Sequence, residues 1–126
     1  MYKKQKTWED AKQHCINTQS NLTSIHSEEE NKFIGKCDFF KCVYWHLKKY
    51  LVIKNGGDHI WTGLYFDTIG KRWRWIEDGS EATFSNWDAG RPTKLLEDDR
   101  MDMTVSYKWH NHPRHLKEFF VCKRKL

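Results

Sequence analysis

The feature that most constrains this chain is a series of aromatic segments in its second half, with one cysteine near each end of the chain. The segments are WTGL at residues 61–64, WRWIEDG at 73–79, FSNW at 84–87 and GRP at 90–92, and they lie between Cys15 and Cys122. Large rings bury much area each, so a small domain can build its core from few of them. A chain of 126 residues is long enough for one domain with one core. We therefore predict a single domain that covers residues 1–126.

The first third of the chain predicts two helices. Thr7 is a suitable N-cap and apolar residues then recur at helical spacing, so we expect a helix over residues 8–18. Ser27 and Glu30 form a capping box, which predicts the start of a second helix. Alternating side-chain types over residues 22–26 indicate a short strand between the two helices.

The rest of the chain predicts strands joined by long loops. The expected strands cover residues 61–65, 73–76, 103–109 and 119–122. Residues 88–102 are irregular, polar and rich in carboxylates. We therefore expect an α+β fold class, with two helices, small antiparallel sheets and a long irregular loop region.

The aromatic segments and the first two predicted helices together resemble the C-type lectin-like domain. The N-terminal part of the resemblance is carried by TWEDA at residues 7–11, HC at 14–15, NLTSI at 21–25 and SEEEN at 27–31. The resemblance implies the C-type lectin-like fold for the chain. It also implies that four tryptophans belong to the core, namely Trp61, Trp73, Trp75 and Trp87.

Four cysteines allow three disulfide pairings. The resemblance implies that Cys15 pairs with Cys122, which leaves Cys37 and Cys42 to pair with each other. Disulfides persist in oxidising compartments, so we expect a secreted protein or the extracellular part of a membrane protein. The glycosylation sequon at Asn21 is consistent with export.

The short inner disulfide of the family is missing from this sequence. Counting along the chain from Cys122 and from Trp109 places its two cysteines at Arg100 and Arg114. Both positions are changed together, so neither leaves an unpaired cysteine. The resemblance therefore implies a loop region without this crosslink.

The calcium ligands of sugar-binding members of the family are also changed. Those members hold Ca²⁺ with a Glu-Pro-Asn motif, a loop carboxylate and a Trp-Asn-Asp motif, whereas this chain has RPT at residues 91–93 and WHN at 109–111. The residues at the ligand positions are Arg91, Thr93, Asp98, His110 and Asn111. Ca²⁺ requires six to eight oxygen ligands, several of them charged, and only Asp98 supplies a carboxylate. The resemblance therefore implies that calcium does not bind here.

Residues 36–54 form an added segment that is rich in aromatic residues and lysines. One helical face is suggested by the spacing of Phe40, Tyr44, Leu47 and Leu51. The segment supplies either a contact surface that includes Trp45, Lys48 and Lys49 or a small satellite core beneath a long loop. The sequence leaves both interpretations open.

We predict a recognition module that binds a protein ligand independently of calcium. The candidate ligand-binding residues are Trp45, Lys48, Lys49, Arg91, Thr93, Lys94, Asp98, His110 and Asn111. The net charge of +5 and the pI near 9.0 favour acidic partners, so calcium-independent binding of anionic, sulfated glycans through Lys and Arg is the first alternative. The second alternative is a divalent-metal-dependent activity at the loop that contains His110, His112 and His115 with Asp98, Asp99 and Asp102.

Several other classes of function are not expected. No serine lies in a nucleophile elbow and no carboxylate pair marks a glycosidase cleft, so we predict no catalytic residues and no enzyme activity. We expect no cofactor, no resident metal and no nucleic-acid partner. No run approaches the 18 apolar residues of a membrane span, and residues 1–4 lack the apolar segment of a signal peptide, which indicates a mature or cloned fragment.

Overall fold

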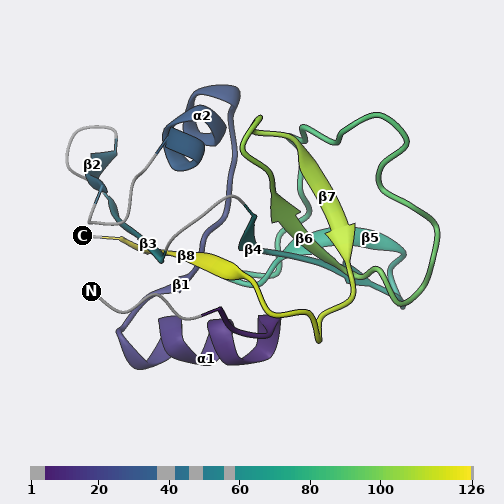
Figure 1. Cartoon of the computed structure of the whole chain (residues 1–126), viewed down its shortest axis with the longest axis horizontal. Helices are drawn as coiled ribbons and strands as arrows, with labels where there is room; N and C mark the ends of the chain where they lie inside the picture. Colours follow the sequence, from purple (N-terminus) through teal and green to yellow (C-terminus); the bar gives the residue numbers. More distant parts are fainter. Residues whose placement is uncertain (1–4, 37–41, 46–49, 56–58, 126) are drawn as a thin grey trace.

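The computed structural model of the chain describes residues 5–36, 42–45, 50–55 and 59–125, with the backbone alone for 42–45 and 50–55. The described elements are α1 (Trp8–Asn17), β1 (Asn21–Leu22), α2 (Glu28–Lys36), β2 (Cys42–Trp45), β3 (Tyr50–Asn55), β4 (Ile60–Asp67), β5 (Arg72–Trp75), β6 (Arg100–Met103), β7 (Trp109–His112) and β8 (Phe119–Lys125). The long connection from β5 to β6 forms the right-hand side of the molecule in Figure 1. We call residues 76–99 the long loop.

The described strands form one mixed sheet. Its main path has the order β2-β3-β8-β4-β6-β7, with β1 added beside β8 and β5 beside β4. The β4–β8 pair is parallel and the other pairs are antiparallel. The parallel pair joins what the sequence predicted as separate small sheets, and α1 and α2 lie on opposite sides of the result (Figure 1). The predicted α+β class is confirmed.

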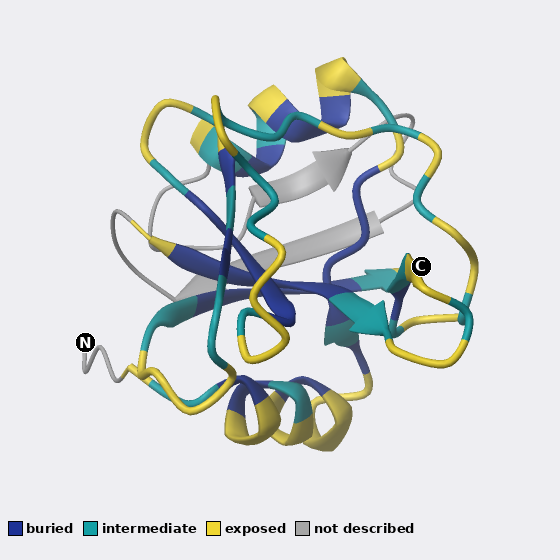
Figure 2. Cartoon of the chain, turned by 90° about the vertical axis from the view of Figure 1, so that its right-hand side faces the viewer, coloured by how far each residue is buried: buried dark blue, intermediate teal, exposed yellow. Residues whose placement is uncertain are grey.

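Both helices begin at the predicted caps. The Thr7 hydroxyl accepts a hydrogen bond from Asp10 N at 3.3 Å, and the Ser27 hydroxyl accepts one from Glu30 N at 3.1 Å. The return hydrogen bond of the predicted capping box, from Ser27 N to the Glu30 side chain, is wrong. The buried Glu30 carboxylate instead accepts a hydrogen bond from Lys123 Nζ at 2.7 Å. That bond ties α2 to β8. Figure 2 shows both helices with exposed residues outward and buried residues toward the sheet.

Alternation along the strands sorts apolar side chains into two cores, one on each side of the sheet. The α2-side core comprises Ile25, Ile34, Ile60, Leu64, Trp75, Met101, Met103, Trp109 and Val121. The α1-side core comprises Trp8, Ala11, Cys15, Leu22, Trp61, Phe120 and Cys122. Neighbouring residues of β4 such as Ile60 and Trp61 therefore belong to different cores. Because the sheet is packed on both faces, polar side chains that it buries need partners within the protein.

The tryptophans predicted for the core are not equally buried. Trp61 and Trp75 have 0% of their surface exposed. Trp73 and Trp87 are half-buried and pack against the edge of the α2-side core, with their ring centroids 5.0 Å apart. Trp109 is fully buried beside them, and Trp87 contacts its ring edge-on at 5.7 Å. The aromatic segments thus build one continuous ring cluster that extends from the core toward the long loop.

The predicted disulfide between the two ends of the chain is confirmed. Cys15 of α1 is bonded to Cys122 of β8, across a sequence separation of 107 residues. Both cysteines are buried in the α1-side core. The predicted pairing of Cys37 with Cys42 lies outside the described residues.

The strand predicted over residues 103–109 is wrong. β6 ends at Met103 and β7 begins at Trp109, and these two residues pair across the strands. Thr104 N donates to the carbonyl of Lys108 at 2.9 Å, so the residues between them form the turn of a hairpin. The apolar alternation misled the prediction because Val105 is 66% exposed at this turn and faces no core.

The helical face predicted in residues 36–54 is also wrong for the part that the structure describes. Residues 42–45 and 50–55 are strands that pair with each other, and β3 pairs with β8 at six positions. Pairing with an existing strand outweighs helical spacing in a segment rich in β-branched and aromatic residues. The short strand predicted over 22–26 is limited to Asn21–Leu22.

Candidate functional site

Four of the predicted ligand-binding residues meet where the long loop lies against β7. Thr93 N donates to Asn111 Oδ1 at 2.9 Å, and Asn111 Nδ2 donates to the carbonyl oxygens of Asp98 at 2.9 Å and Thr93 at 3.1 Å. The Thr93 hydroxyl donates to Asp98 Oδ2 at 2.8 Å. Arg91 Nη1 donates to the Asn111 carbonyl at 2.6 Å. We call Arg91, Thr93, Asp98 and Asn111 the loop cluster.

The loop cluster is closed by its own hydrogen bonds. Asn111 is fully buried, and its side-chain oxygen accepts from Thr93 N and, at 3.3 Å, from Arg91 Nη1. The side-chain oxygens of Asn111 and Thr93 and one oxygen of the Asp98 carboxylate thus accept hydrogen bonds within the same cluster. The positive charge beside them is already supplied by the Arg91 guanidinium. A second cation placed there would meet like charge and few free oxygens.

His110 does not join the loop cluster. Its Nε2 lies 2.8 Å from Asp88 Oδ2, and the His110 ring with the Ala89 amide holds the pKa of Asp88 below its ordinary value. Adjacent residues of a strand point to opposite faces. Asn111 therefore faces the loop cluster, whereas His110 lies on the other face of β7.

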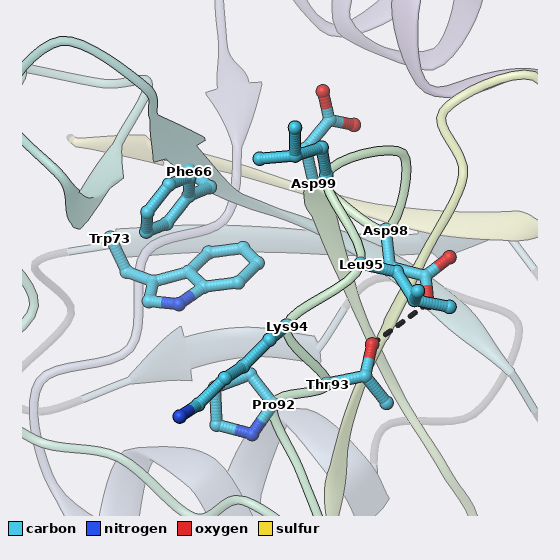
Figure 3. A pocket seen from close by; sticks show the side chains of 9 residues that line it. Phe66, Trp73, Pro92, Thr93, Lys94, Leu95, Asp98 and Asp99 are labelled. Carbon is cyan, nitrogen blue, oxygen red and sulfur yellow. Dashed lines mark hydrogen bonds between the residues drawn. The ribbon is translucent and has the colours of Figure 1, made fainter.

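An open cavity of about 390 Å³ lies beside the loop cluster (Figure 3). It is lined by Phe66, Trp73, Pro92, Thr93, Lys94, Leu95, Leu96, Asp98 and Asp99. Figure 3 shows the rings of Phe66 and Trp73 on one side and the Thr93–Asp98 hydrogen bond on the other. Leu95 and Leu96 are 60% and 80% exposed at its rim. The cavity is thus mostly apolar, with a few polar groups at its edge, as ligand sites usually are.

Several cavity residues were missed by the sequence analysis. Phe66 and Trp73 belong to strands β4 and β5, and their rings contact each other edge-on at 5.4 Å. Leu95 and Leu96 could have been noticed, because two adjacent leucines stand out in a polar, acidic stretch. Of the predicted residues, Thr93, Lys94 and Asp98 line the cavity. The side chains of Trp45, Lys48 and Lys49 lie outside what the structure describes, so their predicted role stays a prediction.

The two arginines at the inner-disulfide positions are joined through one carboxylate. Asp99 Oδ2 accepts from Arg114 Nη2 and lies 3.3 Å from Arg100 Nη1. The Arg100 guanidinium also lies over the Trp8 ring at 4.3 Å. Burial lowers the pKa of Arg100, and the hydrogen bond to Asp99 raises that of Arg114. This Asp99 bridge connects the end of the long loop to residues 113–118, where the family has a covalent link.

The histidine and carboxylate loop of the second alternative is only partly assembled. Of its six residues, Asp102, His110 and His112 come together, with ligand atoms within 4.8 Å of one another. Asp98 and Asp99 are bonded elsewhere and His115 is exposed. Two residues that the sequence analysis missed adjoin the group. These are His59, 3.6 Å from Asp102, and Glu118, whose pKa is raised to about 10 by burial and the Asp102 carboxyl.

The fold and the position of the loop cluster define a C-type lectin-like domain. Residues 4–124 match the family described as the Lectin C-type domain, and the chain belongs to that family. The C-type lectin lectoxin-Lio1 of Erythrolamprus poecilogyrus is 30% identical over 131 residues, covering 98% of this chain and 71% of the relative.

Solved structures agree with the family assignment. A calcium-independent type II antifreeze protein has a TM-score of 0.77 at 23% identity, covering 98% of this chain and 82% of its own. The mouse scavenger receptor C-type lectin carbohydrate-recognition domain has a TM-score of 0.76 at 25% identity, covering 99% and 84%. Domains of this family are generally binding modules for proteins or glycans and not enzymes. In the described part of the chain, neither helix is long and apolar enough to cross a membrane.

Proposed function

We propose that this chain is an extracellular recognition domain that binds a protein ligand through its long loop and without calcium. The observation that carries the proposal is the closed loop cluster, in which Arg91 and Asn111 satisfy each other at the position where the family binds calcium. The buried Cys15–Cys122 disulfide and the lectin relatives support an oxidising, extracellular setting.

Calcium would have to break the loop cluster in order to bind. Ca²⁺ takes six to eight oxygens at 2.3–2.6 Å, typically several of them carboxylate oxygens. The loop cluster offers one carboxylate, Asp98, and that group already accepts a hydrogen bond from Thr93. Displacing Arg91 would also leave its guanidinium without the Asn111 oxygens that now accept its hydrogen bonds.

The cavity beside the loop cluster suits an apolar protein surface better than a sugar. Sugars present hydroxyl groups, whereas Phe66, Trp73 and the exposed leucines present apolar surface. Exposed apolar groups with a polar rim are typical of protein contact sites. Lys94 also lines the cavity, and the chain has a net charge of +5. Because positive charge attracts anionic ligands, binding of an anionic glycan is the second candidate function.

Calcium independence is tested by thermal unfolding. Millimolar CaCl₂ and EDTA should give the same melting temperature, because only a ligand that binds the native state raises it. Isothermal titration with CaCl₂ should show no site. A melting temperature that rises with calcium would overturn the proposal.

The protein-ligand part is tested by capture from extracellular fluid in EDTA, with matched variants. Leu96→Asp places a charge at the rim of the cavity, and Val105→Asp makes the same change at a comparably exposed position on the β6–β7 turn. The first should reduce capture at least tenfold and the second should leave it unchanged. If heparin competes and Lys94→Ala weakens binding while Leu96→Asp does not, the glycan alternative replaces the proposal.

A further inference from the structure

We propose that the β6–β7 hairpin carries a site for a divalent transition metal, with Zn²⁺ the best fit, in which Asp102, His110 and His112 are ligands and His59 completes the coordination shell. This site is independent of the protein-binding function proposed above. It shares His110 with the calcium-ligand positions of the family, but its other ligands, Asp102, His112 and His59, lie outside the loop cluster.

Strand geometry brings the three main ligands together. In the β6–β7 register Asp102 stands opposite His110, and Arg100 stands opposite His112. Side chains two residues apart share a face of a strand, and diagonal neighbours on paired strands are within reach of long side chains. The intervening residues of both strands are fully buried on the other face, which fixes the alternation. These residues are Met101, Met103, Trp109 and Asn111.

Asp102 is the residue that points most directly to a cation site. Its side chain is 0% exposed, and no N–H or hydroxyl group of the described residues donates to its carboxylate, whose hydrogen-bonding neighbour is the Glu118 carboxyl. A buried carboxylate without a cationic partner is costly, so such groups are usually paired with a cation or bound to metal. The carboxyl of Glu118 shares a hydrogen bond with Asp102 but supplies no positive charge. A metal ion would satisfy Asp102 directly.

The distances fit ligands arranged around an ion. Asp102 Oδ2 lies 3.6 Å from His59 Nδ1 and 3.7 Å from His112 Nε2, which is too long for a hydrogen bond. Two ligands at about 2.0–2.1 Å from a tetrahedral Zn²⁺ are roughly 3.3 Å apart. A shift of a few tenths of an ångström would therefore bring these atoms into one coordination shell. The His59 side chain is 54% exposed, so it is free to make that adjustment.

The ligand chemistry selects the kind of metal. Imidazole nitrogens with one carboxylate suit Zn²⁺ or Cu²⁺, whereas Ca²⁺ and Mg²⁺ prefer oxygen ligands. His110 already has the orienting contact that metal-bound histidines usually have, because its Nε2 lies 2.8 Å from Asp88 Oδ2. That contact leaves the Nδ1 atom of His110 for the ion.

The test is isothermal titration of the chelator-treated, tag-free protein with ZnCl₂, with CaCl₂ and MgCl₂ as comparison cations. We expect about one Zn²⁺ per chain, no binding of Ca²⁺ or Mg²⁺ at this site, and a higher melting temperature with Zn²⁺. His112→Ala should weaken Zn²⁺ binding at least tenfold. His115→Ala is the matched control, because His115 is exposed on the following loop and outside the group, and it should change nothing.

Cobalt provides a second readout that does not depend on stability. Co²⁺ bound by histidines and a carboxylate in place of Zn²⁺ should give visible absorption bands that His112→Ala abolishes and His115→Ala retains. Asp102→Asn should lose both the Zn²⁺ binding and the Co²⁺ absorption bands. If Asp102→Asn does not fold, His112→Ala still decides the test. Absence of a zinc site, or equal weakening by His112→Ala and His115→Ala, would overturn the proposal.

Discussion

Replacing Asp99 with asparagine tests how the loop region is held without the inner disulfide. The variant keeps the size of the side chain and removes the charge that Arg100 and Arg114 share. The Asp99 and Arg100 side chains are only 10% and 8% exposed, whereas Arg114 is 50% exposed. The two ion pairs should therefore contribute very differently to stability.

The magnitude follows from burial. Removing one partner of a buried ion pair typically costs about 3–5 kcal/mol, whereas an exposed pair contributes about 0–1 kcal/mol. Arg100 keeps two contacts in the variant, its hydrogen bond to the Asp99 carbonyl at 2.9 Å and its stacking on Trp8. We therefore expect the low end of the buried range, about 3 kcal/mol. For a domain of this size that corresponds to a fall in melting temperature of roughly 10 °C.

Urea unfolding followed by tryptophan fluorescence measures this loss, and Asp67→Asn is the matched control. Asp67 makes the same kind of bond to Arg74, at 2.9 Å, but the two side chains are 24% and 29% exposed. The control should lose much less stability than Asp99→Asn, and added salt should reduce that loss. Equal losses in the two variants would show that burial does not set the strength of the Asp99 bridge.

The remaining predictions concern the links that hold α1, α2 and β1 to the rest of the sheet. Lys123→Met leaves the buried Glu30 carboxylate without its ion-pair partner and should lower the free energy of unfolding in urea by about 3–5 kcal/mol. Adding Glu30→Met should recover most of that loss. A double variant no more stable than Lys123→Met would contradict this. Replacing Cys15 and Cys122 with serine should cost about 4–5 kcal/mol, and a melting temperature that reduction leaves unchanged would argue against it. Gly63→Ala places a Cβ 2.7 Å from a β1 carbonyl oxygen and should cost about 1–3 kcal/mol by thermal melting, with a neutral result refuting the close packing.

The parts of the fold that the sequence predicted are those with local signals. Thr7 and Ser27 mark helix starts by chemistry that acts within one turn, and both caps are present. The strands at Trp61 and Trp73 follow from alternation and turn residues, which are also local. The Cys15–Cys122 bridge came from resemblance to a family, since spacing alone leaves three pairings.

The predictions of local structure that were wrong depended on contacts between residues far apart in the sequence. Residues 50–55 form a strand because β8 lies beside them, and no local pattern reports that neighbour. Glu30 leaves its predicted cap because Lys123 reaches it across 93 positions of sequence. The residues of the loop cluster were named as candidates from aligned motif positions, but their hydrogen bonds and the cavity were not predicted. Phe66 and Trp73 line the cavity only because β4 and β5 pack against the long loop.

In the function that we propose, the loop cluster holds the lectin-like loop in place without calcium. A calcium ion would bring two charges and would require most of the nearby oxygens as ligands. The Arg91 guanidinium brings one charge and directional donors, so Asn111 can be satisfied by a side chain that belongs to the same loop. Fewer carboxylates are then needed at this position, and the neighbouring residues Leu95 and Leu96 are free to be apolar. Under the proposed function, the arginine that takes the place of the metal thus leaves room for an apolar contact surface beside it.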